Sequence, residues 1–285
     1  MSRFPFVQFV LAGELGVSNG RYPARPPGSD GEGGTHSVLV TRTFGAAAPR
    51  RGRRKQKPRA ADPQAELALP VTELTVIDAD PLEGDPGPWL KRIGRDDELR
   101  DEVVSRALAT ARRAVAARRV AAADPDVSDP SVEAALATRV GYGQADDLVD
   151  GRYEEAIELP RETRRSGRIA ALRPQERMAA ILGGRERPLA CEELILRARA
   201  DLDGARGREA ALQLRVGLEA LLADRDRFGQ QGQDDDLAAL EARRGPTGAA
   251  ANEALAGDLT PDRAAEVAAT VELCERVLRR KALRG

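Results

Sequence analysis

The chain has 285 residues, of which 41% are hydrophobic, 32% are charged and only 3% are aromatic, and its net charge is −1. This composition is typical of amphipathic helices rich in Ala, Leu, Arg and Glu, and it argues against a large sheet and against sites that bind sugars or bases by stacking. No stretch approaches the roughly 20 apolar residues that a membrane span requires, so we expect a soluble, cytoplasmic protein without a membrane partner.

The first 82 residues are predicted to form a small β-rich part. Four segments within them are rich in β-branched and aromatic residues and are separated by Gly, Pro, Asn and Asp: residues 6–11, 17–22, 37–44 and 71–77. Together they predict a small antiparallel sheet, which is stable only if a helix covers one face. The Gly-rich stretch 26–34 between the second and third segments predicts a mobile loop.

A strongly basic stretch lies between the third and fourth of these segments. Residues 1–60 contain eleven basic and three acidic residues, a net charge of +8, which leaves −9 for the rest of the chain. Seven of the ten positions 50–59, which we call the basic segment, are cations: Arg50, Arg51, Arg53, Arg54, Lys55, Lys57 and Arg59. Their mutual repulsion predicts that residues 46–70 form a disordered loop, which is tethered at both ends if residues 71–77 return to the sheet.

Residues 83–160 are predicted as a helical middle region. A short helix around Trp89 precedes a long one over residues 96–120, which begins with a suitable capping aspartate and repeats apolar residues every three or four positions. A further helix is expected over residues 131–140, and Gly141-Tyr142-Gly143 is interpreted as a turn or a helix cap. Residues 152–159 are compatible with either a strand or a helix.

Residues 161–285 are predicted as a helical C-terminal region. The expected helices are, in chain order, one that begins at Pro174, then 188–203, 208–224, 237–243, an Ala-rich one, and a terminal helix capped by Thr260. The terminal helix is predicted to bury a stripe of apolar residues: Val267, Val271, Cys274, Val277 and Leu278. The second and third of these helices are joined by a short connection that contains two glycines. Such a connection forces antiparallel neighbours, so the pair predicts an αα-hairpin.

No group of residues forms a recognisable catalytic or metal-binding motif. His36 is the single histidine, and Cys191 and Cys274 stand far apart in apolar helical patterns, without the spacing of a zinc site. The acidic clusters lack the spacing of a calcium loop, and Gly183-Gly184 does not fit a phosphate-binding loop, so a turn or helix cap is expected there. We therefore expect no metal, no cofactor and no enzymatic activity; an active site assembled from scattered acids stays open as the alternative.

These observations predict an α+β fold that is mainly α, with a small N-terminal antiparallel sheet, disordered loops, and an irregular helical array that contains the αα-hairpin. The preference for arginine over lysine is typical of a GC-rich bacterial genome. Amphipathic helices without a catalytic motif favour a non-catalytic interaction or scaffold protein, whose helical faces bind a protein partner or a second copy of the chain.

The alternative function depends on the basic segment. Flexible cations neutralise phosphates and release counterions, which predicts salt-sensitive, sequence-blind binding of RNA or DNA. No aromatic residue interleaves the seven cations, so base stacking is not expected. A second interpretation is that the segment is a solvated loop that contacts the acidic helices of its own chain.

Overall fold

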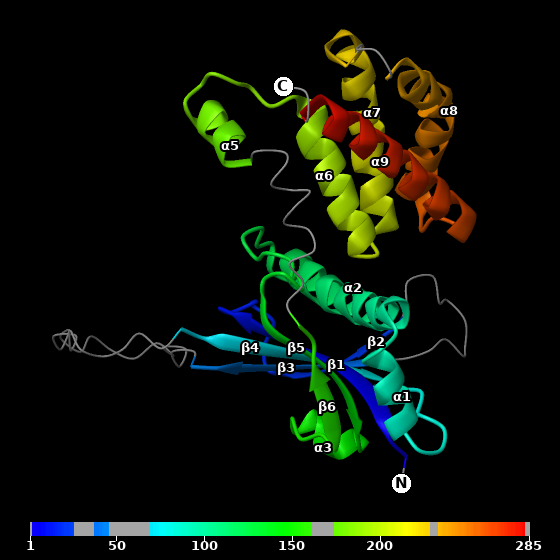
Figure 1. The fold of residues 1–285 in the computed structure, drawn as a ribbon. Helices are drawn as coiled ribbons and strands as arrows, with labels where there is room; N and C mark the ends of the chain where they lie inside the picture. The colour runs from blue at the N-terminus through cyan, green and yellow to red at the C-terminus, as the bar shows by residue number, and fades with distance from the viewer. Residues whose placement is uncertain (1, 26–36, 46–68, 161–173, 229–232, 283–285) are drawn as a thin grey trace, which may run out of the picture. The chain divides into compact units, whose positions relative to one another are not determined.

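The computed structural model describes residues 2–25, 37–45, 69–160, 174–228 and 233–282. The chain divides into two compact units, Met1–Arg161 and Glu162–Gly285, and each has a hydrophobic core of its own. In the described residues the first unit, which we call the sheet unit, contains all the strands, and the second, the helical unit, contains only helices (Figure 1). The predicted fold class, α+β and mainly α, is confirmed.

The sheet unit is built on a sheet that has six antiparallel strands among the described residues. In chain order they are β1 (Phe4–Ala12), β2 (Gly20–Ala24), β3 (Ser37–Phe44), β4 (Val71–Asp78), β5 (Ala135–Gly143) and β6 (Glu155–Glu158). Their order across the sheet is β2-β3-β4-β1-β5-β6, so the first strand lies in the interior. The four strands predicted in the N-terminal part are all present. Because β4 pairs with β3, the prediction that the basic stretch is tethered at both ends is confirmed.

The middle region differs from its prediction, because it supplies two strands to the sheet. The helix expected over residues 131–140 is wrong: β5 begins within this segment and pairs with β1, with Val140 opposite Val7. The turn expected at Gly141-Tyr142-Gly143 is also wrong, since all three residues belong to β5. The segment has no strong strand propensity, but the edge of β1 offers backbone groups that need partners, and this long-range pairing overrides the local preference.

One face of the sheet is covered by α1 (Gly87–Ile93) and α2 (Asp97–Ala122); Figure 1 shows α2 above the sheet. Both helices were predicted, and so was the cap of the second: the Asp96 carboxylate accepts the N–H of Leu99 at 3.0 Å. The core of this unit combines the inward residues of these helices and strands, among them Val7, Phe9, Leu39, Leu74, Ile93, Val104, Leu108 and Ala111.

The opposite face of the sheet carries α3 (Ala145–Val149), whose Leu148 is buried against Phe6, Val40 and Ile77. Neighbouring residues of β1 therefore serve different cores, since Phe6 packs under α3 while Val7 packs under α2. This alternation explains why β1 is hydrophobic almost throughout: both of its faces are buried.

A row of polar side chains crosses four strands on the face that carries α3. Gln8 of β1 is only 3% exposed, and its Nε2 donates to Oγ1 of Thr75 at 3.2 Å. Its Oε1 accepts a hydrogen bond from Nη1 of Arg139 at 3.0 Å, and Nε of Arg139 donates to Glu158 at 3.2 Å. Because a buried amide is costly unless its donor and acceptor are both paired, this row favours one register of β4, β1, β5 and β6.

Thr41 of β3 lies on the face covered by α2, as Leu39 does, and it provides a test of how an unpaired polar group affects the stability of this unit. Its side chain is fully buried, and its hydroxyl has no hydrogen-bond partner in the part of the chain that the structure describes. Thr41→Val keeps the shape and removes the unpaired hydroxyl, so we expect it to raise the free energy of unfolding by about 1 kcal/mol. The matched control is Thr75→Val, which removes the acceptor of Gln8 and should lower that free energy by about 1 kcal/mol. Denaturant unfolding followed by Trp89 emission measures both; a destabilised Thr41→Val would contradict the prediction.

The helical unit contains α5 (Pro174–Leu182), α6 (Ala190–Asp203), α7 (Gly207–Ala223), a 3-10 turn (Arg225–Arg227), α8 (Asp234–Ala256) and α9 (Pro261–Ala282). The predicted hairpin is confirmed as α6 and α7, which pack closely against each other. Helix α8 packs on α7, and α9 contacts α6, α7 and α8. The start of α5 at Pro174 and the cap of α9 are also confirmed, since Thr260 Oγ1 accepts the N–H of Arg263 at 3.3 Å.

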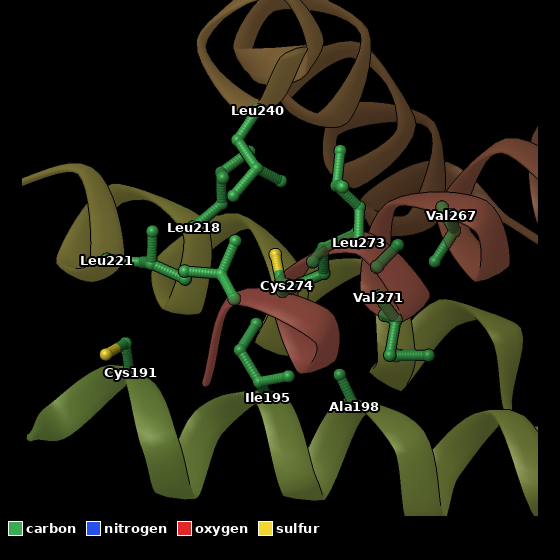
Figure 2. Packing of buried hydrophobic residues seen from close by; sticks show 14 of the residues in the cluster. Cys191, Ile195, Ala198, Leu218, Leu221, Leu240, Val267, Val271, Leu273 and Cys274 are labelled. Carbon is green, nitrogen blue, oxygen red and sulfur yellow. The ribbon is translucent and has the colours of Figure 1, made fainter. Parts of the chain in front are cut away.

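The core of the helical unit lies between α6, α7, α8 and α9. Figure 2 shows their apolar side chains converging: Cys191, Ile195, Ala198, Leu218, Leu221, Leu240, Val267, Val271, Leu273 and Cys274. The stripe predicted for the terminal helix is therefore the one that is buried.

Helix α8 also differs from its prediction. The short helix expected over residues 237–243 and the Ala-rich helix after it form one continuous helix of 23 residues, with Pro246 inside. A proline lacks the N–H of an interior helical residue and usually ends a helix. Here buried residues on both sides of it, including Leu240 and Ala250, belong to the same core, so tertiary packing holds the two halves together. No helix in the described ranges is both long and apolar enough to span a bilayer.

Candidate functional site

The structure fixes both ends of the connection that carries the basic segment. Residues 50–59 themselves, the Gly-rich stretch 26–34 and His36 lie outside the described residues. The connection leaves β3 at Gly45 and returns at Leu69; a Cβ placed on Gly45 would lie 3.5 Å from the carbonyl oxygen of Leu69. The N–H of Gly13 donates to the carbonyl of Pro70 at 2.7 Å and ties the returning end to the sheet. The basic segment is therefore attached at one place, where β3 ends and β4 begins.

An exposed aromatic ring stands at this place. Phe44 is the last residue of β3, and 45% of its surface is exposed. The guanidinium carbon of Arg42 lies 5.2 Å from the ring centroid, within the range of a cation–π contact. Nη1 of Arg42 in turn donates to the carbonyl of Asp150 at 2.6 Å, so the cation is anchored. Sequence reasoning missed Phe44, because its hydrophobicity predicts a strand but not whether a neighbour covers the ring.

Both cysteines lie in the core of the helical unit, as their apolar surroundings predicted. Neither side chain is exposed, and they do not form a disulfide (Figure 2). Burial raises the pKa of the Cys191 thiol to about 11 and that of the Cys274 thiol to about 12. Because the thiolate is the nucleophile and the metal ligand, these protonated, inaccessible thiols are unsuited to either role.

The buried thiols lead to a prediction about pH. In the unfolded chain both thiols ionise near their ordinary pKa, whereas in the folded protein they stay protonated to a higher pH. The stabilising contribution is therefore complete below about pH 9 and is lost as the pH rises toward 11 and 12. We expect the free energy of unfolding of the helical unit to fall over this range, and to fall less in Cys191→Ala/Cys274→Ala.

We also expect a thiol reagent at pH 8 to label the native protein only as fast as the helical unit opens. Rapid labelling would contradict the burial of the two thiols.

The other motifs considered in the sequence have structural explanations. A Cβ on Gly141 would meet the backbone of β6, at 2.8 Å from Cα of Ala156, so this glycine permits close approach of two strands. Gly183 and Gly184 follow α5, and Gly184 has a φ of +71°, which confirms the expected helix cap. Among the described residues, no three His, Cys, Asp or Glu side chains gather in a way that could hold a metal ion.

A cluster of charges attaches α5 to the start of α6. Nη2 of Arg177 donates to both carboxylate oxygens of Glu192 at 2.9 and 2.8 Å, and its Nε donates to Glu186 at 2.8 Å. Glu192 also accepts the N–H of Leu189 at 3.0 Å and lies 3.5 Å from Nζ of Lys281. Although burial raises the pKa of Glu192, the hydrogen bonds from Leu189 and Arg177 outweigh it and lower the pKa below its ordinary range. The carboxylate thus stays ionised and fixes α5 at this end of the unit.

The apolar residues of α5 do not enter the core. The helix has nine residues, none of which is buried. Met178 is 55% exposed and Leu182 is 80% exposed, one turn apart on the same side of the helix. Isolated helices of this length are marginal in water, so α5 is held by its charges rather than by apolar burial within its own unit.

Comparison of the chain with protein-family models, with curated proteins and with solved structures finds no match in any of the three.

Proposed function

We propose that this chain is a non-catalytic interaction protein, and that its helical unit binds a protein through α5. The observation that carries the proposal is the exposure of Met178 and Leu182 on a short helix that ion pairs hold in place. An amphipathic helix with an open apolar side is a usual ligand for a hydrophobic groove, in which residues one turn apart act as anchors. The charge cluster at Arg177 would present these anchors in a fixed direction.

The partner that we propose is a second copy of the chain. A hollow of about 490 Å³ lies between α7 and α8. Its lining combines apolar residues with three charged ones: Leu222, Leu237, Ala238 and Ala242 with Arg225, Asp234 and Glu241. It offers the apolar surface that α5 lacks within its own unit. In such a dimer, α5 of each copy would lie in the hollow of the other copy, so the same contact would form twice. This is the symmetric arrangement usual in homodimers.

Self-association can be tested with a charge introduced on α5. Met178→Glu/Leu182→Glu keeps good helix formers but should abolish the contact, because burying a carboxylate against leucine and alanine, beside Asp234 and Glu241, is unfavourable. The matched control is Leu196→Glu, which charges another exposed leucine, 60% exposed on α6. Light scattering coupled to size exclusion should give the mass of a dimer for the wild type and the control, and that of a monomer for the α5 variant. A monomeric wild type at high concentration would refute the proposed dimer.

A second candidate function, nucleic-acid association, is favoured by the attachment of the basic segment. The connection that carries its seven cations leaves the sheet unit and returns to it at one place, beside the exposed Phe44. Cations concentrated on one tethered segment can follow a phosphate backbone without ordering the rest of the protein. The interpretation that competes with it is contact between the basic segment and acidic residues of the same chain.

The test of this candidate is the salt dependence of binding. A variant with glutamine at all seven basic positions keeps the length of the connection and removes its charge; a control keeps the charge by replacing the five arginines with lysine. Fluorescence anisotropy with labelled oligonucleotides should show that the wild type and the lysine control bind, and that both lose affinity steeply as salt is added. For a duplex, the logarithm of the association constant should fall by about 0.9 per phosphate contacted for each unit in the logarithm of the salt concentration. The glutamine variant should not bind. Equal binding by all three proteins would remove the basic segment from the function.

A further inference from the structure

The hollow between α7 and α8 carries charge as well as apolar surface. Its lining includes the carboxylates of Asp234 and Glu241 and one guanidinium, that of Arg225, so acid is in excess. Both carboxylates belong to α8, seven positions apart, which is about 10 Å along a helix. Glu241 is exposed, and its oxygen lies 3.5 Å from Nη1 of Arg244, which is a long ion pair. Because binding surfaces are complementary in charge, an occupant of this hollow should bring a cation with it.

Helix α5 carries such a cation at its C-terminal end. The helix ends at Leu182, and Nε of Arg185 lies 3.7 Å from the position of a Cβ added to Gly183. The guanidinium is therefore at the same end of α5 as Leu182, one of its two apolar anchors, and Arg185 is exposed. The neighbouring Glu186 does not cancel this charge, because its carboxylate accepts from Nε of Arg177 at 2.8 Å.

We infer that Arg185 selects the partner of α5: it pairs with a carboxylate in the hollow of the second copy, that of Asp234 or Glu241. The inference deepens the proposed function and rests on it. The nine residues of α5 span about 13 Å, and the stretch of α8 between the two carboxylates spans about 10 Å, so the two match in length. Since the carboxylates lie at opposite ends of that stretch, either direction of α5 in the hollow brings Arg185 beside an acid.

This arrangement of charge favours a second copy over an unrelated protein. Each copy carries the cation beside its apolar anchors and the two acids in its hollow, so a symmetric dimer matches both sets of charges at once. An apolar groove on an unrelated protein would leave both sets unmatched. Charge across an interface gives specificity more than affinity, so the contact of Met178 and Leu182 with the hollow would still supply most of the binding energy.

The experiment reverses each set of charges alone and then both together, in the full chain. Arg185→Glu, and separately Asp234→Lys/Glu241→Lys, should each raise the dissociation constant of the dimer about tenfold, because each brings like charges together. The variant with all three substitutions restores opposite charges, so it should dimerise within about threefold of the wild type. An equimolar mixture of the two weakened proteins should form a heterodimer, since both of its contacts again join opposite charges.

Sedimentation equilibrium measures these dissociation constants, and far-ultraviolet circular dichroism shows that each variant is folded. The matched control is Arg197→Glu, which reverses another exposed cation, on α6, and should dimerise as the wild type does. If Arg185→Glu does not fold, the neutral Arg185→Gln replaces it and should weaken the dimer about threefold.

The outcomes separate the inference from the function on which it rests. If the wild type is monomeric, the proposed dimer and the inference are both wrong. If Met178→Glu/Leu182→Glu dissociates the dimer but Arg185→Glu dimerises as tightly as the wild type, the proposed function stands and the pairing of Arg185 is wrong. A loss in Arg185→Glu that neither the triple variant nor the mixture restores would also overturn the inference, because charge would then not be its cause.

Discussion

Gly141→Ala is expected to destabilise the sheet unit by about 3 kcal/mol, the largest effect that we predict for a single added methyl group. A Cβ at this position would collide with the carbonyl oxygen of Glu155 and lie 2.7 Å from Cβ of Ala156. The atoms that it meets include the backbone of β6, which cannot turn aside as a long side chain can. Strand β6 would have to move away from β5, and the pairing of Val140 with Ile157 would be lost or distorted.

The matched control is Gly143→Ala in the same strand. Its Cβ would meet the side chain of Leu148 at 3.0 Å, and a leucine can adjust, so we expect a cost of about 1 kcal/mol or less. Denaturant unfolding followed by Trp89 emission reports on this unit alone, because the chain has one tryptophan. Equal stability of Gly141→Ala and wild type would show that β6 does not lie where the structure places it.

A second readout follows from the hydrogen bond next to this glycine. The Oη of Tyr142 donates to Glu155 at 2.7 Å, and this bond raises the pKa of the tyrosine to about 12. If β6 moves away in Gly141→Ala, the tyrosine loses this partner. Its ionisation, followed by ultraviolet absorbance, should then shift down toward the ordinary pKa of 10.

Gly217→Ala should destabilise the helical unit by about 2 kcal/mol, although the same change in an open helix is stabilising. The new Cβ would lie 2.8 Å from Cδ1 of Ile195, which is fully buried between α6 and α7. Overpacking thus outweighs the gain in helix propensity. Gly248→Ala in α8, where nothing lies within 4 Å of the added Cβ, should raise the free energy of unfolding by about 1 kcal/mol.

A double-mutant cycle identifies the clash. Ile195→Val removes Cδ1, the atom nearest to the new methyl group, and by itself should cost about 1 kcal/mol. In the double variant, the methyl group added at Gly217 fills the space that Cδ1 leaves. The double variant should therefore be more stable, by about 2 kcal/mol, than the sum of the two single costs predicts. Far-ultraviolet circular dichroism during denaturant unfolding measures all four proteins. Simple additivity would mean that the methyl group and Ile195 do not meet.

The accuracy of the sequence-based predictions differs between the two units for a physical reason. In the helical unit, the αα-hairpin and the buried side of α9, with Val271 and Cys274, follow from the spacing of apolar residues every three or four positions. This spacing is visible within one or two helical turns. In the sheet unit, the segment 135–143 has Ala, Thr and Gly in a pattern that fits several structures. Its identity as a strand depends on β1, more than a hundred residues earlier in the chain.

The candidate sites show the same division. The basic segment was found from its composition alone, because seven cations in ten positions need no fold to be recognised. Phe44 was not found, since its exposure depends on whether any other element covers the end of β3. The open side of α5 was also not visible in the sequence, where Met178 and Leu182 look like ordinary core positions.

By itself, the sequence determined the local features of this protein: the helix caps at Asp96 and Thr260, the amphipathic faces, the strand-forming segments and the concentration of charge. Each of these features is set by residues within a few positions of one another, because capping hydrogen bonds and the spacing of apolar side chains involve only near neighbours in the sequence. Only the tertiary structure decided that β5 is a strand, that α8 continues through Pro246 and that Arg42 orients an exposed Phe44. These outcomes depend on surfaces supplied by distant parts of the chain, whose burial outweighs local preference once they meet.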